Sequence, residues 1–117
     1  MDYAQLRIFC LDLNGAEETW PFGPEVTVFK LAGKMFALCN PAQSPLRINL
    51  KCEPGLAELL RENYAAVQPG WHMNKRHWNT VTLNSDLPDQ EVCKQIVHSY
   101  ALIKASLPKR IRETLSD

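Results

Sequence analysis

The most chemically varied stretch of the sequence runs from Gln68 to Val81. Within it, residues 71–79 hold two tryptophans, two histidines, two asparagines and two cations. Imidazoles titrate near neutral pH, cations and amides contact phosphates, and flat rings stack on nucleobases. Pro69-Gly70 indicates a break in the chain, because proline fixes φ and glycine permits positive φ. The β-branched run 80–83 then predicts that the stretch leads from a turn directly into a strand.

Nucleic-acid binding, to DNA or RNA, is the function that these residue types favour. Amide forks from the asparagines can reach base edges or phosphates, and a tryptophan offers a stacking surface. If the strand predicted at 46–51 neighbours the strand at 80–83, its cations join Lys75 and Arg76 in one patch. Lys30 joins this patch only if its side chain lies on the same face of the sheet. The candidate contacts are Arg47, Lys51, Trp71, His72, Asn74, Lys75, Arg76, His77 and Asn79.

The charge balance limits the strength of such binding. The 13 basic and 13 acidic residues give a formal net charge of zero, which argues against a generic polyanion binder. Binding must then come from local charge placement and be weak. About four phosphate contacts would lower log affinity with log salt at a slope of about −3 to −4.

The same stretch also has a structural interpretation. Asparagine side chains at turns often bond to nearby backbone, and Trp78 is the type of residue that fills space beside a sheet. The motif would then be a latch that joins the loop after the second helix to the sheet. A latch and a binding surface are compatible, so both interpretations stay open.

Catalysis and metal binding find little support. His72 and His77 are the acid–base candidates of the motif, but the sequence shows no Gly-rich phosphate loop, HExxH or GxSxG. We therefore predict no catalytic residues, no cofactor and no metal. The four cysteines lack CxxC spacing and are expected to be reduced core fillers: Cys10, Cys39, Cys52 and Cys93.

The elements that must position the motif follow from periodicity. We expect a helix from Tyr3 that is capped by Asp2. A connector follows at 16–25, whose Trp20 and Phe22 are expected to fold back on the core. Hairpin strands are then expected at 26–32 and 35–39, with their turn at Gly33-Lys34. The strand at 46–51 alternates most clearly, with Arg47, Asn49 and Lys51 on its polar face. A helix then starts at Pro54, with a predicted buried stripe of Leu56, Leu59, Leu60 and Tyr64, before the strand at 80–83 and a last helix from Pro88 to Leu107.

This order, αβββαβα, predicts a single α+β domain over residues 1–117, in which an antiparallel sheet carries helices on one face and a basic, frayed tail follows at 108–117. Such a sheet leaves an uncovered face or edge, which makes a protein-interaction module the alternative function, through a partner or self-association. No basic leader precedes an apolar segment and no apolar run reaches about 18 residues, so we expect a cytoplasmic protein without membrane contact.

The segment from Pro69 to Val81 resembles the signature of the MmcQ/YjbR family of small bacterial proteins. The lesser motifs of that family resemble the runs 50–54, 56–61, 87–89 and 98–100, so that the likeness covers nearly the whole chain. One departure is Glu53, where the family commonly has aspartate. The resemblance implies an α+β domain with a CyaY-like or secretion-chaperone-like sheet, and DNA binding through a double-wing arrangement.

Overall fold

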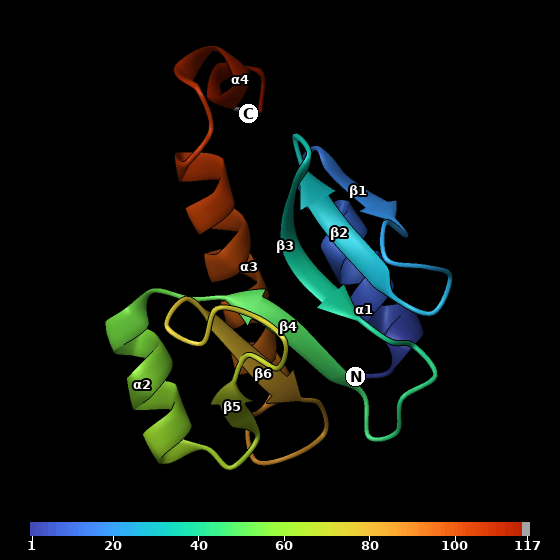
Figure 1. Ribbon diagram of the computed structural model, residues 1–117, viewed down its shortest axis with the longest axis vertical. Coiled ribbons are helices and arrows are strands. Elements are labelled where there is room, and N and C mark those ends of the chain that lie inside the picture. The colour runs from blue at the N-terminus through green and yellow to red at the C-terminus, as the bar shows by residue number, and fades with distance from the viewer. Residues whose placement is uncertain (116–117) are drawn as a thin grey trace.

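Six antiparallel strands, in the spatial order β1-β2-β3-β4-β6-β5, form the sheet of the computed structural model, which describes residues 1–115 (Figure 1). This arrangement confirms the predicted α+β fold class. The strands are β1 (Ala16–Thr19), β2 (Thr27–Leu31), β3 (Lys34–Cys39), β4 (Arg47–Lys51), β5 (Val67–Pro69) and β6 (Trp78–Thr82). The helices are α1 (Tyr3–Asp12), α2 (Pro54–Asn63), α3 (Asp89–Ala105) and α4 (Lys109–Thr114).

Helices α1 and α3 lie behind the sheet in Figure 1 and bury its core face. The ring of Phe36 meets Tyr100 of α3 edge-on, with 5.6 Å between the ring centroids. Ser99 joins the same two layers, because its hydroxyl donates to the Phe36 carbonyl and accepts from the Lys51 N–H. Helix α2 lies beside β5, at the edge of the sheet. The opposite face of the central strands therefore has no helix across it.

The clearest sequence patterns form the expected elements. Asp2 caps α1 in a reciprocal capping box with Gln5. In β4, Ile48 and Leu50 are buried against the helices, while the residues that alternate with them face the other way. Glu53, the departure from the family pattern, nevertheless caps α2 by accepting the N–H groups of two residues in its first turn. Within residues 1–115, no helix has the length and apolar character that a membrane crossing requires.

The structure corrects the prediction at the edges of the sheet. The expected connector at 16–25 begins with strand β1, and the unexpected strand β5 runs into the break expected at Pro69-Gly70, because it includes Pro69. Trp20 and Phe22 were expected to fold back on the core, but their side chains are 50% and 61% exposed. Trp20 stays at the surface because its indole N–H donates to the Thr27 hydroxyl, at 3.3 Å.

Two local details also differ from expectation. The hairpin turn is Ala32-Gly33 rather than Gly33-Lys34, with φ angles of 49° and 83°, because Lys34 pairs with Leu31. Positive φ at both central positions is typical of a type I′ turn. In α2, Leu59 is 54% exposed and Ala57 is the buried residue. The predicted stripe is therefore wrong at Leu59.

Candidate functional site

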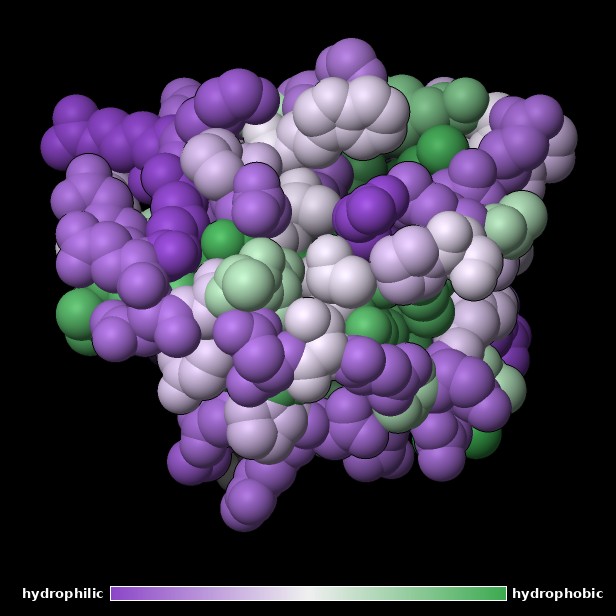
Figure 2. All heavy atoms as spheres, turned by 90° about the horizontal axis from the view of Figure 1, so that it is seen from below, coloured by the Kyte–Doolittle hydropathy of each residue, from purple (hydrophilic) through white to green (hydrophobic). Residues whose placement is uncertain are grey.

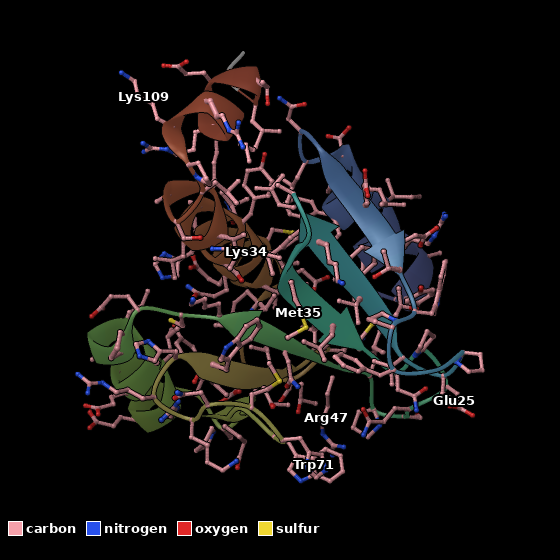
Figure 3. The ribbon with its side chains drawn as sticks, turned by 45° about the horizontal axis from the view of Figure 1, so that its top comes forward. Glu25, Lys34, Met35, Arg47, Trp71 and Lys109 are labelled. Carbon is pink, nitrogen blue, oxygen red and sulfur yellow. The ribbon has the colours of Figure 1, made fainter. Side chains whose placement is uncertain are left out.

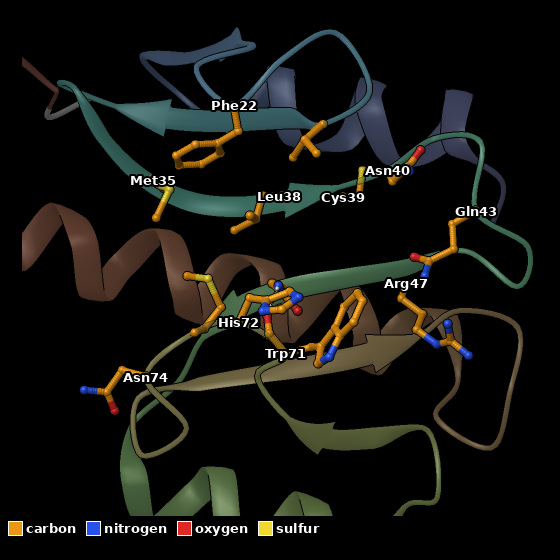
Figure 4. A pocket seen from close by; sticks show the side chains of 13 residues that line it. Phe22, Met35, Leu38, Cys39, Asn40, Gln43, Arg47, Trp71, His72 and Asn74 are labelled. Atoms are coloured by element: carbon orange, nitrogen blue, oxygen red, sulfur yellow. Dashed lines mark hydrogen bonds between the residues drawn. The ribbon is translucent and has the colours of Figure 1, made fainter.

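The sheet register brings one row of side chains together on the face opposite the helices. Val28 pairs with Leu38, Leu38 with Asn49, and Asn49 with Thr80, so these four residues cross β2, β3, β4 and β6 on the same side. We call this side the open face. Phe22, from the loop 20–26, and Trp71, from the loop 70–77, approach it from opposite sides (Figure 4).

The larger hollow on the open face has a volume of about 620 Å³, within the range of about 300–1,000 Å³ that is usual for ligand pockets. Its apolar side comes from the β2–β3 hairpin and the loop before it. Its polar side comes from β4 and from the loop between β3 and β4. We call it the aromatic hollow, and it is lined by Phe22, Val26, Met35, Leu38, Cys39, Asn40, Gln43, Arg47, Asn49, Trp71, His72, Met73 and Asn74.

A second hollow of about 420 Å³ shares Gln43, Arg47 and Trp71 with the first. Its other lining residues are more polar, and we call it the polar hollow: Ala65, Gln68, Pro69, Thr80 and Thr82. Arg47 and Trp71 therefore lie where the two hollows adjoin, and Figure 3 shows them close together. Seen from below, the surface is largely hydrophilic, with hydrophobic residues recessed between polar ones (Figure 2).

Hydrogen bonds to the sheet fix the backbone of Trp71. Its N–H donates to the Thr80 hydroxyl at 2.9 Å, and its carbonyl accepts from the Asn49 amide at 3.2 Å. Gly70 permits this close approach, because a Cβ there would lie 2.7 Å from the Cβ of Trp78. The indole itself is 64% exposed, and the ring of His72 lies 4.3 Å from it, centroid to centroid.

Arg61 of α2 anchors the remainder of the loop. Its Nε donates to the Asn79 Oδ1 at 2.7 Å, and its guanidinium also donates to the carbonyls of Trp78 (3.1 Å) and Lys75. The Lys75 ammonium donates to the Gly70 carbonyl at 3.0 Å, so this cation closes its own loop. Asn79 is only 2% exposed. The inner residues of the motif therefore form the latch that the structural interpretation expected.

The candidate cations are spread along β4 and are not gathered in one patch. Arg47 pairs with Thr82 and Lys51 with Trp78, so the two lie at opposite ends of the strand. Lys75 and Arg76 precede Trp78 and belong to the Lys51 end. Of the predicted contacts, the hollows bring together four: Arg47, Trp71, His72 and Asn74. Lys30 lies on the open face by register, opposite Glu17.

Charge around the two hollows is unbalanced although the whole chain is neutral. No aspartate or glutamate among residues 1–115 lines either hollow, and no described carboxylate lies within 4.0 Å of a charged nitrogen of Arg47. Elsewhere, four described carboxylates lie within 4.0 Å of a basic group. Glu18 accepts from Arg7 on the other face, and this hydrogen bond lowers the pKa of the Glu18 carboxyl. The open face thus has a positive group without a neighbouring negative one.

Sequence reasoning missed several lining residues, including Phe22, Gln43 and Thr80. Thr80 and Thr82 alternate with buried Val81, and this pattern was a readable signal for a second polar strand on the same face. Phe22 had a weaker signal, an aromatic residue within a proline- and glycine-rich loop. In the part of the chain that the structure describes, no three His, Cys, Asp or Glu side chains are grouped closely enough to hold a metal ion.

Comparisons with known proteins agree on one family. The model of the YjbR family matches residues 11–102. The chain is 38% identical to protein YbdF of Escherichia coli O157:H7 over 100 residues, covering 86% of this chain and 82% of that protein. It is 33% identical to protein YjbR of Escherichia coli K12 over 115 residues, 98% of each chain.

Solved structures show the same fold. Protein DR2400 of Deinococcus radiodurans superposes with a TM-score of 0.92 and 36% identity, covering 97% of this chain and 87% of that one. A protein from Pseudomonas syringae superposes with a TM-score of 0.75 and 28% identity, covering 88% of this chain and 99% of that one.

Proposed function

This chain belongs to the YjbR family, and we propose that it binds nucleic acid weakly through the open face of its sheet. The observation that carries the proposal is that no acidic residue of the described chain, 1–115, lines either hollow while Arg47 lines each of them. A neutral protein that keeps its acids out of these hollows makes them attractive to a polyanion. We propose binding without catalysis, and a cytoplasmic location, which the free cysteines suit.

Exposed rings give the second support. Trp71 and Phe22 are 64% and 61% exposed and approach the aromatic hollow from two different loops. Large exposed apolar groups gathered at one place usually mark an interaction site. Aromatic rings stack on any base through its π-face, and each stacked base contributes about 1–3 kcal/mol.

The structure lowers the expected number of phosphate contacts. Lys75, although exposed, already donates to the Gly70 carbonyl, which leaves Arg47, Lys51 and Arg76 as the candidate cations without a side-chain hydrogen bond within residues 1–115. Three contacts give a salt slope of about −2 to −3, shallower than the slope expected from four. The binding should therefore be weak and should tighten in dilute buffer.

The test is fluorescence anisotropy of labelled single-stranded and duplex DNA at two salt concentrations. Arg47→Gln should weaken binding and make the slope less negative by about 0.7–0.9, the share of one phosphate contact. Arg110→Gln is the matched control, because this exposed arginine of α4 lines neither hollow. Absence of binding in dilute buffer, or binding that salt does not weaken, would refute the proposal.

A protein-interaction module is the second candidate, because the sheet ends in two short edge strands, β1 and β5, beside exposed rings. Each edge presents backbone groups that an added strand can pair with. Sedimentation velocity would show self-association directly. A concentration-dependent dimer together with no nucleic-acid binding would favour this second function over the first.

A further inference from the structure

We infer that the ligand is a single strand, and that one unpaired base enters the aromatic hollow while the adjoining sugar–phosphate lies in the polar hollow against Arg47. This inference rests on the proposed function and names the form of nucleic acid that the open face takes. It follows from the positions of the rings, from the polar groups left available, and from the way the two hollows adjoin.

The rings require an unpaired base. Phe22 and Trp71 border the aromatic hollow from opposite sides, with Met35 and Leu38 between them (Figure 4). In a duplex, the faces of each base are covered by its neighbours in the stack, so a protein ring finds no face to contact. Bases of a single strand can splay out and stack on aromatic side chains. A single strand can therefore insert a base into this hollow, whereas an intact duplex cannot.

Polar groups of the hollow predict little discrimination between bases. The Asn49 amide group donates to the Trp71 carbonyl and its oxygen accepts from Thr80, so this side chain is already occupied. The Asn40 oxygen accepts from the Ala42 N–H at 3.0 Å, which leaves its amide hydrogens. Gln43 and Asn74 are the other amides that line the hollow, and the Asn74 oxygen already accepts from the Arg76 N–H. Few base-edge bonds and a large apolar contact are typical of sequence-tolerant binding.

Arg47 is placed for the phosphate. It lines both hollows, so its side chain lies beside the path of a backbone that passes from one hollow to the other. A guanidinium binds phosphate with two parallel hydrogen bonds. The remaining lining of the polar hollow includes Gln68 and Thr82, which suit a sugar and its hydroxyl groups. The apolar and polar hollows therefore match the two chemically different parts of a nucleotide.

The test compares three labelled probes of equal length in dilute buffer: oligothymidylate, a strand of the same backbone without bases, and a duplex. The thymidylate strand should bind best. Trp71→Ala should weaken its binding about 5- to 150-fold, the factor that corresponds to about 1–3 kcal/mol of base stacking. The same change should leave binding of the abasic strand unaltered, and Trp71→Phe, which keeps a ring, should restore most of the affinity.

Trp20→Ala is the matched control, because Trp20 is also a half-exposed indole, in the same loop as Phe22, but lines neither hollow. A strand that carries 2-aminopurine supplies a second readout. Its fluorescence should be quenched by the natural protein and not by Trp71→Ala.

Equal affinity for the abasic and thymidylate strands, or duplex binding as tight as single-strand binding, would overturn the base-insertion inference. If Arg47→Gln still weakened binding of the probes in that case, the proposed function would stand. If none of the three probes bound, the proposed function itself would fall.

Discussion

Arg61 is the residue whose removal should reveal how the motif is held. Its guanidinium reaches from α2 to three acceptors near the start of β6: the Asn79 side chain and the carbonyls of Trp78 and Lys75. We predict that Arg61→Ala destabilises the protein while leaving helix α2 formed, because alanine is at least as good a helix former as arginine.

The magnitude follows from what is left without a partner. Asn79 is 2% exposed, so its orphaned oxygen should cost about 1–3 kcal/mol. The Trp78 carbonyl still accepts from the Gly70 N–H, and the carbonyl of exposed Lys75 can find water, so the two should add about 1 kcal/mol between them. The expected loss is therefore about 2–4 kcal/mol of unfolding free energy, a large part of the roughly 5–15 kcal/mol of a typical domain. Arg61→Lys should recover little, because one ammonium cannot span all three acceptors.

Urea denaturation followed by circular dichroism measures this loss. Arg76→Ala is the control, since Arg76 is exposed and lies in the same loop but its side chain makes no hydrogen bond or ion pair within residues 1–115, and it should change stability by less than about 0.5 kcal/mol. A double-mutant cycle with Asn79→Ala should show coupling of about 0.5–3 kcal/mol. If Arg61→Ala costs no more than Arg76→Ala, the latch does not contribute to stability and the reasoning is refuted.

Two further predictions concern titratable groups. Burial raises the pKa of the Cys10 and Cys39 thiols to about 12 and that of Cys52 to about 11. At about pH 8 a thiol reagent should therefore modify half-buried Cys93 first, and should modify all four cysteines only after unfolding. Rapid labelling of several thiols in the native protein would contradict this prediction. Backbone N–H groups, that of Ala66 foremost, lower the pKa of Asp86, so its contribution is present above the unfolded value of about 4 and is lost as pH falls through the folded pKa. The melting temperature of Asp86→Asn should thus lie below that of the natural protein at neutral pH, and the gap should close in acid; a constant gap would count against the mechanism.

Periodic burial was readable from the sequence because it is repeated over many residues. Strand β4 and helix α3 bury the side chains that their patterns predicted, including Ile48, Leu50 and Ile96. Strands β1 and β5 were missed because each is short and at an edge. The sequence of β1, Ala-Glu-Glu-Thr, has no buried residue and takes its strand form from pairing with β2.

The candidate site was only partly readable, for a reason that lies in tertiary contacts. The motif at 68–81 was recognised by its composition, but composition does not tell which of its polar groups turn inward. The Asn79 oxygen accepts from Arg61, and the Lys75 ammonium donates to the Gly70 carbonyl. No local sequence pattern indicates either bond. Phe22 joins the site across the sheet from a loop far away in sequence, a contact that only the β2–β3–β4 pairing specifies.

Latch and binding surface are best understood as two sides of one loop. Arg61 fixes the inner groups of the loop to α2, and separate bonds with Thr80 and Asn49 hold the Trp71 backbone so that its indole projects over the hollows. A ring that is already positioned loses little conformational freedom when a ligand arrives, which matters most where few charges contribute to affinity. In a neutral protein with about three available cations, such preorganisation would decide whether weak attraction becomes binding. Loosening the loop through Arg61 should therefore lower affinity even though Arg61 lines neither hollow.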